Sequence, residues 1–295
     1  MIAQLVQLPD FIELQPGSVA GTWLTIMVSS SILCFVVSEI TRNYSQVDKL
    51  WSIMPVIYSI ITLSANPTPR LWVMTILVSA WGLRLSYNFS RKGGYNIIPW
   101  KGEEDYRWKI MQQKPALKGR LRFGLFNLLF ISFYQHFLIM LFSTPILLSS
   151  MYPGSSLTYL DALAASLVIF FLVVETVADN QQARFQKIKH GELKKEGVFT
   201  ESLTKGFLSE GLWTYVRHPN FSSEQGIWLS FYLFGVSASG KWLNWTLSGS
   251  LLLVLLFIGS TILTEQISSE KYKAYAEYRK QVPKLLPSFS KKIRK

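Results

Sequence analysis

Residues 215–224 bring several chemically active side chains into one short segment. They are Tyr215, Arg217, His218, Asn220 and Glu224. From residue 227 onward the chain turns apolar, so a cation, an imidazole, an amide and a carboxylate lie at the mouth of a membrane-like stretch. Ionisable groups at such a position are costly and usually mark a functional site. The alternative is that they begin an amphipathic helix and anchor it at the interface.

A proline sets the local structure of this segment. Pro219 fixes its own φ and removes a backbone donor, and it disfavours helical geometry at His218, which we therefore expect in a turn. Asn220 then occupies the position of a helix N-cap. Asn220 and Glu224 are four residues apart, so the spacing predicts that they share one helix face.

A second polar stripe ends an earlier apolar run. Glu175, Asp179 and Gln182 follow the spacing of one helical face. Ionisable groups at this depth normally point at a cavity or a partner. Asp179 is therefore a candidate site residue, although it could instead cap an interfacial helix or pair with Arg184.

Three polar residues lie singly in apolar runs. Arg84 either snorkels to the nearby interface or contacts a carboxylate or cofactor. Glu39 is either a snorkelling end residue or an acid on the substrate side. His136 is expected to be a hydrogen-bonded core histidine.

Long apolar blocks must position these groups. The chain has 295 residues, 49% of them hydrophobic, and the blocks are long enough to cross a bilayer. We predict an all-α, polytopic membrane helix bundle that forms one domain over 1–295. The seven expected transmembrane helices are 18–40, 51–65, 71–89, 123–148, 157–178, 225–239 and 241–263. A charged amphipathic helix is expected in the tail, 264–295, with Lys271, Tyr275 and Tyr278 on one face.

The charge distribution predicts the orientation. Of 30 Lys and Arg residues, 27 lie between spans one and two, three and four, five and six, or in the tail. The positive-inside rule then places the N-terminus outside and the C-terminus in the cytosol. The net charge of +12 is thereby explained by membrane topology, without nucleic acid. We expect a multi-pass protein of a bacterial inner membrane or the endoplasmic reticulum.

Several kinds of chemistry lack their motifs. The sequence contains no G-x-G-x-x-G, no G-x-x-x-x-G-K-[ST], no H-E-x-x-H and no C-x-x-C. A soluble dinucleotide domain is therefore not supported. Cys34 is the single cysteine and the three histidines are scattered, so neither a disulfide nor a catalytic zinc centre is expected.

Three motifs together resemble the steroid 5α-reductase-like membrane proteins. They are E-T-x-A-D-N-Q-Q at 175–182, R-H-P-N-F-x-x-E at 217–224 and Y-x-x-Y-x-x-x-V-P at 275–283. The resemblance covers about 40–290 and is strongest to the mostly bacterial branch that is catalogued as a domain of unknown function. S-x-x-D-x-x-W at 45–51 and W-x-x-R-L at 81–85 also look like that branch.

The resemblance implies a seven-helix bundle that holds NADPH in a cavity open to the cytosol. Such proteins reduce an activated C=C bond beside a ketone in a lipid-soluble, steroid-like substrate. Asn220 and Glu224 would contact the nicotinamide end, with Trp228 one turn below. Asp179 would lie in the cofactor pocket, and Arg217 and His218 near the phosphates or ribose. The full set of expected cofactor residues is Arg84, Asp179, Gln182, Tyr215, Arg217, His218, Asn220, Glu224, Trp228 and Tyr275.

The substrate side of the site is less defined. Glu39 and Tyr87 are the candidate catalytic residues, by position only. The chain departs from steroid-reducing relatives at T-I-L-T-E-Q-I-S-S-E-K, where they carry an Arg- and His-rich stretch. An alternative function is S-adenosylmethionine-dependent methyl transfer, because isoprenylcysteine carboxyl methyltransferases share an R-H-P-x-Y segment. The expected partners are a lipophilic small-molecule substrate and the lipid bilayer. No obligatory protein partner is expected.

Overall fold

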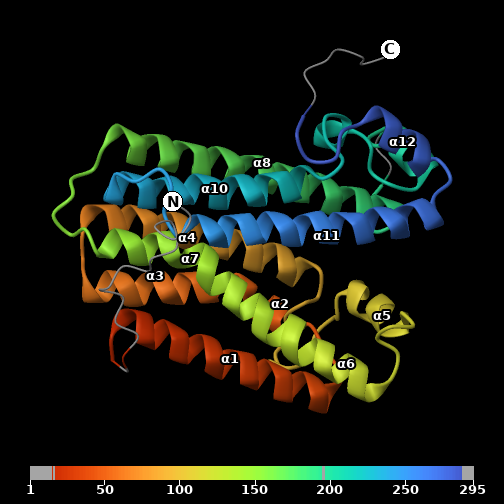
Figure 1. The fold of residues 1–295 in the computed structure, drawn as a ribbon. Coiled ribbons are helices and arrows are strands. Elements are labelled where there is room, and N and C mark those ends of the chain that lie inside the picture. The colour runs from red at the N-terminus through yellow and green to blue at the C-terminus, as the bar shows by residue number, and fades with distance from the viewer. Residues whose placement is uncertain (1–14, 16, 195–196, 288–295) are drawn as a thin grey trace. The chain divides into compact units, whose positions relative to one another are not determined.

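The computed structural model describes residues 15, 17–194 and 197–287, and within them every regular element is helical. This confirms the all-α prediction for the described part of the chain. Figure 1 shows the helices as a ribbon. Residues 1–14 and 288–295 lie outside the described residues, so the structure does not test the predictions for the N-terminal segment or for the end of the tail.

Five helical segments in the described residues are long and apolar enough to cross a membrane. They are Val19–Thr41, Gln46–Ala65, Arg120–Ser150, Tyr159–Lys189 and Leu247–Lys271. These segments indicate a multi-pass membrane protein. The other two predicted spans correspond to helices α4 (Pro69–Arg91) and α10 (Pro219–Ser239), which are long but carry more polar residues.

The chain divides into two compact units. Unit 1 comprises residues 1–165 and 230–252, and unit 2 comprises residues 166–229 and 253–295. The division falls inside α8 (Tyr159–Lys189), α10 and α11 (Leu247–Lys271).

Unit 1 is built around α3 (Met54–Ala65), which packs against α1 (Val19–Thr41), α4 and α7 (Gln135–Ser150). Figure 1 shows α1 in red and α3 in orange, with α7 in light green beside α3. On α1 and α3, the rings of Trp23 and Tyr58 stack with their centroids 4.6 Å apart. A Cβ at Gly82 would lie 2.6 Å from the carbonyl oxygen of Ser52, so glycine is needed where α4 approaches the start of α3.

Most of the second predicted span, 51–65, is helix α3, and only Trp51 belongs to the helix before it. Helix α2 (Gln46–Trp51) ends at a turn, and Pro55 lies in the first turn of α3, where its missing N–H costs no hydrogen bond. The fourth predicted span also changes along its length. It begins as α6 (Arg120–Phe126), widens into the π-helix η1 (Asn127–Tyr134) and continues as α7. π-Helical turns are rare and often occur at functional sites.

A buried ion pair accounts for one cation outside the basic loops. Arg70, which is 2% exposed, donates to Asp161 from Nε at 2.8 Å and from Nη2 at 3.0 Å. Its guanidinium also donates to the carbonyl oxygen of Ser156 at 2.6 Å and to the hydroxyl of Ser155. Because Arg70 is neutralised inside unit 1, it does not act as a free positive charge in the positive-inside count.

Unit 2 contains two small aromatic and aliphatic clusters. The first consists of Phe185, Ile188, Phe199 and Leu208. The second packs Phe207 against Tyr275 and Tyr278, with ring centroids 5.0 and 5.2 Å apart. These clusters fix the polar segment between α8 and α10, including α9 (Thr200–Lys205) and the 3₁₀ turn η2 (Gly211–Thr214).

The prediction of one continuous tail helix is wrong. Helix α11 continues to Lys271, the chain then leaves helical geometry, and α12 (Tyr275–Gln281) begins anew. Lys271 and Tyr275 therefore do not belong to one helical face. The break lets Tyr275 and Tyr278 pack on Phe207, and that burial of aromatic surface outweighs the local helical preference.

Candidate functional site

Helix α10 begins two residues earlier than the N-cap prediction requires. Pro219 is its first residue, His218 precedes it outside the helix, and the N–H of Ser222 donates to the carbonyl of His218. Asn220 is therefore inside the first turn, and the prediction that it caps the helix is wrong. Proline is favoured at the first helical position because its φ is already helical. As predicted, His218 is not helical; it lies in irregular backbone directly before α10.

Asn220 bonds to Asp179 on α8. Its Nδ2 donates to Asp179 Oδ1 at 3.3 Å, which joins two of the residues that the sequence predicted for one site. The close approach of the helices is made possible by Gly226, where a Cβ would lie 2.7 Å from the ring of Phe171. Asn220 Oδ1 is buried and has no hydrogen-bond partner among the described residues. A buried acceptor without a donor is costly, so this atom is suited to receive a ligand N–H or O–H.

Glu224 lies one turn further along α10 and is 4% exposed. Its Oε1 accepts from the indole Nε1 of Trp228 at 3.0 Å, and Trp228 is 1% exposed. Glu224 is therefore buried and is not exposed to water at the start of α10. As predicted, Asn220 and Glu224 belong to one helix and lie four residues apart, because α10 is helical through both. A buried carboxylate thus lies one helical turn after Asn220 on α10.

Arg217 and His218 are engaged by a carboxylate on α11. Glu265, which is 2% exposed, accepts from Arg217 Nε at 2.7 Å, and its Oε1 lies 3.1 Å from His218 Nε2. Arg279 on α12 completes the group with Nε 3.4 Å from Glu265 Oε2. The side chains of Arg217 and His218 are 8% and 6% exposed, so they and Glu265 are shielded from water, whereas Arg279 is 46% exposed.

The same arginine holds the C-terminal segment. Arg217 Nη1 donates to the carbonyl of Arg279 at 2.8 Å and to the carbonyl of Val282, and the backbone N–H of Arg217 donates to the carbonyl of Pro283 at 2.9 Å. Carbonyls at the end of a helix lack internal partners, so Arg217 satisfies the end of α12. The R-H-P-N segment therefore fixes the tail through Arg217.

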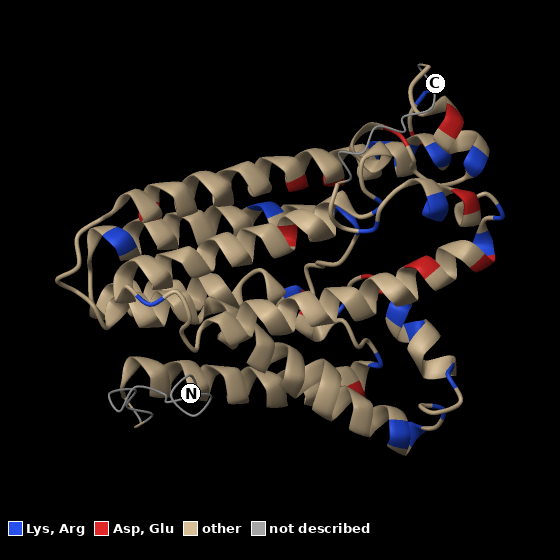
Figure 2. Cartoon of the chain, turned by 45° about the horizontal axis from the view of Figure 1, so that its top comes forward, with Lys and Arg blue, Asp and Glu red and all other residues tan. Residues whose placement is uncertain are grey.

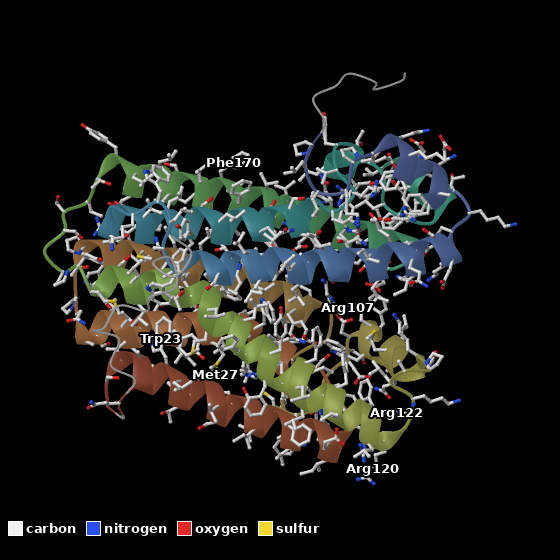
Figure 3. The ribbon with its side chains drawn as sticks, viewed as in Figure 1. Trp23, Met27, Arg107, Arg120, Arg122 and Phe170 are labelled. Carbon is white, nitrogen blue, oxygen red and sulfur yellow. The ribbon has the colours of Figure 1, made fainter. Side chains whose placement is uncertain are left out.

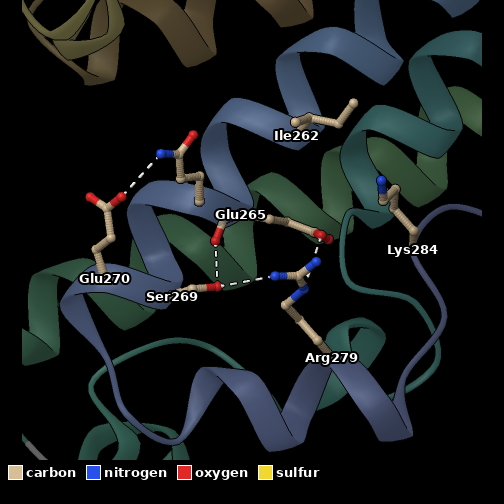
Figure 4. Close-up of a pocket in the computed structure, with 7 residues that line it drawn as sticks. Ile262, Glu265, Ser269, Glu270, Arg279 and Lys284 are labelled. Atoms are coloured by element: carbon tan, nitrogen blue, oxygen red, sulfur yellow. Dashed lines mark hydrogen bonds and ion pairs between the residues drawn. The ribbon is translucent and has the colours of Figure 1, made fainter.

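Glu265 and Arg279 of this cluster also line a pocket of about 360 Å³, a volume within the range of small-molecule sites. Its lining residues are Ile262, Glu265, Gln266, Ser269, Glu270, Arg279 and Lys284. Figure 4 shows Arg279 reaching both Glu265 and Ser269 on α11. Gln266 donates to Glu270 at 3.1 Å. Most of the polar groups are thus paired with one another, which favours a role in holding the tail.

The remaining predicted cofactor residues of unit 2 differ in exposure. Tyr275 is 5% exposed, and burial raises its pKa to about 12, so its phenol stays protonated at physiological pH. Tyr215 is 55% exposed, and Gln182 is half-buried on α8. The structure therefore gathers Asp179, Asn220 and Glu224 in one unit and leaves Tyr215 at its surface.

The candidate catalytic residues belong to unit 1. Tyr87 on α4 is 64% exposed, and the guanidinium of Arg91 lies 5.0 Å from the centroid of its ring. Arg84 is half-buried on the same helix. Glu39 on α1 is bound by Arg42 Nη1 at 2.8 Å, so its carboxylate is paired.

Asn127 is a residue that sequence reasoning missed. It opens the π-helix η1, is fully buried, and donates from Nδ2 to Ser38 Oγ at 2.9 Å and to Glu39 Oε1 at 3.0 Å. Asn127 thereby fixes the orientation of Glu39. Nearby on the same long helix, the Nδ1 of His136 lies 2.7 Å from the carbonyl of Ser132, which confirms the hydrogen-bonded core histidine. A polar asparagine inside the predicted apolar span 123–148 was the feature of the sequence that could have indicated this site.

Comparison with known proteins identifies the family. A family model described as "Protein of unknown function (DUF1295)" matches residues 34–282. The chain belongs to the DUF1295 family. A relative, the uncharacterized protein C594.04c of Schizosaccharomyces pombe, is 38% identical over 264 residues, which are 85% of this chain and 74% of the relative. No solved structure matches the chain. The DUF1295 match includes both polar stripes and the tail as far as Val282.

Proposed function

We propose that this DUF1295 protein is a membrane-embedded, NADPH-dependent reductase. Its substrate class is a lipid-soluble, steroid-like molecule with a C=C bond conjugated to a carbonyl group. The observation that carries the proposal is the Asp179–Asn220 hydrogen bond beside the buried acceptor Asn220 Oδ1, in one unit with the buried carboxylate of Glu224. The motif resemblance to the steroid 5α-reductase-like proteins gives this arrangement its chemical interpretation.

These residues fit one end of a nicotinamide cofactor. A carboxamide offers two N–H donors, and Asn220 Oδ1 and the carboxylate of Glu224 are acceptors held on consecutive turns of α10. Trp228 fixes the orientation of Glu224 by donating to it. When bound, NADPH supplies the hydride for reduction of the conjugated double bond. The protein's part is to hold the ring, to exclude water and to present a donor to the carbonyl oxygen.

Roles in unit 1 and at the tail follow from the contacts described above. We assign Glu39 and Tyr87 to the substrate side, with Asn127 as the positioning residue of Glu39. Arg217 and His218 bind Glu265, so we assign them the role of positioning residues that fix the tail. This assignment replaces direct contact with the cofactor phosphates.

Nucleotide selectivity tests the function. In purified, detergent-solubilised protein, NADPH is expected to raise the melting temperature more than S-adenosylmethionine does, because a ligand stabilises the state to which it binds. The melting temperature is measured with each nucleotide at equal concentrations. Stabilisation by S-adenosylmethionine and none by NADPH would instead indicate the methyltransferase.

The proposed topology has seven spans. It adds α4 and α10 to the five apolar segments, and places the N-terminus outside and the C-terminus in the cytosol, with the site of unit 2 on the cytosolic side. A reporter enzyme that works only in the cytosol is expected to be active when it is fused after Lys295. Activity of a reporter that works only on the opposite side of the membrane, fused at the same position, would overturn this orientation.

A further inference from the structure

A stretch without any acidic residue precedes the span Arg120–Ser150. It contains α5 (Tyr106–Gln113), a turn and the start of α6. Five exposed cations form what we call the basic patch: Lys109, Lys114, Lys118, Arg120 and Arg122. Figure 2 shows the positively charged positions at this end of the long helix.

Two of the three acids just before this stretch, Glu104 and Asp105, are bound inside unit 1. Glu104 Oε1 accepts from the backbone N–H of Tyr44 at 2.8 Å. Burial raises the pKa of Asp105, but the hydrogen bonds and charge of Arg107 outweigh it and lower that pKa, so the Asp105–Arg107 pair stays ionised. Trp108 Nε1 donates to Asp48 at 3.0 Å and fixes α5 to α2. These contacts engage Glu104 and Asp105 within unit 1, and Lys109 of the basic patch interacts electrostatically with Glu104.

The basic patch does not serve the fold of unit 1. None of its five side chains makes a hydrogen bond or ion pair in the described part of the chain. Arg120 and Arg122 also lie in the first turn of α6, where a cation faces the positive end of the helix dipole. Neither helix formation nor internal pairing explains the charges of the four cations other than Lys109, so their counter-charge is expected outside the protein.

Exposed apolar side chains accompany the patch. Leu121 and Leu125 on α6 are 87% and 55% exposed, and Tyr106 at the start of α5 is 50% exposed. Figure 3 shows Arg120 and Arg122 extending away from the ribbon at the start of this helix. Because the membrane span itself begins at Arg120, the patch lies at the level of lipid headgroups.

We propose that the basic patch binds the headgroups of anionic phospholipids in the leaflet where the span Arg120–Ser150 begins. Clusters of Lys and Arg next to a membrane helix attract anionic lipid, and the leucines beside them enter the acyl boundary. The interaction ties α5 and the turn before α6 to the membrane surface. It depends on neither the cofactor nor the reaction proposed above.

Lipid binding to the purified full-length protein tests this surface. Phosphatidylglycerol and phosphatidylcholine are titrated separately in mixed micelles, and retained lipid is measured by native mass spectrometry. Phosphatidylglycerol is expected to bind in preference to phosphatidylcholine. Neutralising four of the five cations is expected to weaken phosphatidylglycerol binding at least about tenfold and to leave phosphatidylcholine unchanged. The substitutions are Lys114→Gln, Lys118→Gln, Arg120→Gln and Arg122→Gln.

A matched variant removes the same charge from exposed lysines of unit 2. Its substitutions are Lys187→Gln, Lys194→Gln, Lys273→Gln and Lys280→Gln. This variant is expected to keep its preference for phosphatidylglycerol. An equal loss in both variants, or wild-type protein without a preference, would overturn the proposal. Displacement of the lipid by soluble glycerol 3-phosphate at equal concentration would assign the patch to a soluble anion and would also overturn it.

If the variant with four substitutions in the basic patch fails to fold, the double variant Lys114→Gln with Lys118→Gln replaces it. Both lysines lie in the turn between α5 and α6, outside the helices. This pair is expected to weaken phosphatidylglycerol binding at least about threefold. Unchanged binding in a folded pair variant would contradict the proposal.

Discussion

Replacing Arg217 with alanine is expected to lower the free energy of unfolding by about 3 kcal/mol. Removal of one partner from a buried ion pair costs about 3–5 kcal/mol, because the other charge stays buried. We expect the low end because Glu265 keeps His218 at 3.1 Å and Arg279 at 3.4 Å. For a chain of this size the loss corresponds to a fall of roughly 6–12 °C in melting temperature.

Arg279→Ala is the matched control. It removes the same kind of side chain from the same carboxylate, but Arg279 is 46% exposed. Exposed ion pairs contribute about 0–1 kcal/mol, so its melting temperature is expected to change little. Thermal unfolding of both variants in one detergent gives the comparison. Equal melting temperatures for the two variants would show that Arg217 does not hold the tail.

A second readout separates this role from direct cofactor binding. Arg217 donates to the carbonyls of Arg279 and Val282, so its loss is expected to expose the segment after Gln281 to protease. Arg217→Ala with Glu265→Ala removes both charges and is expected to regain part of the lost stability. A variant that lost NADPH affinity while its tail stayed protected would instead favour contact between Arg217 and the phosphates.

Local spacing predicted part of the candidate site. The four-residue separation of Asn220 and Glu224, and the stripe of Glu175, Asp179 and Gln182, each depend on one helix alone. Helical periodicity is a property of the local sequence, so these faces could be predicted without a structure. The all-helical class followed in the same way from the length of the apolar blocks.

Long-range partners could not be predicted in this way. Glu265 is 48 residues from Arg217, and Glu39 is 88 residues from Asn127. Periodicity shows which face of a helix is polar but not which distant helix it meets. The prediction of a continuous tail helix failed for a related reason. Tyr275 and Tyr278 pack on the distant Phe207, and local helix propensity gives no information about that contact.

Glu224→Gln is expected to weaken NADPH binding at least about tenfold. The glutamine keeps an oxygen that can accept from Trp228 Nε1, so the packing of α10 is retained. It loses the negative charge, and charge-assisted hydrogen bonds contribute about 1.5–3 kcal/mol. A loss of about 1.4 kcal/mol raises the dissociation constant tenfold. If Glu224 only stabilised the start of α10, the variant would lose about 0.3–1 kcal/mol of stability and keep its affinity.

Glu201→Gln is the control, because Glu201 is an exposed carboxylate of unit 2 that pairs with Lys205. The most direct measurement is a titration of purified wild-type protein and both variants with NADPH, followed by energy transfer from tryptophan to the bound nucleotide. We expect saturable binding to wild type and to Glu201→Gln, with at least about tenfold weaker binding to Glu224→Gln. Absence of saturable binding to folded wild-type protein, or equal affinity in all three proteins, would contradict an NADPH site at Asp179, Asn220 and Glu224.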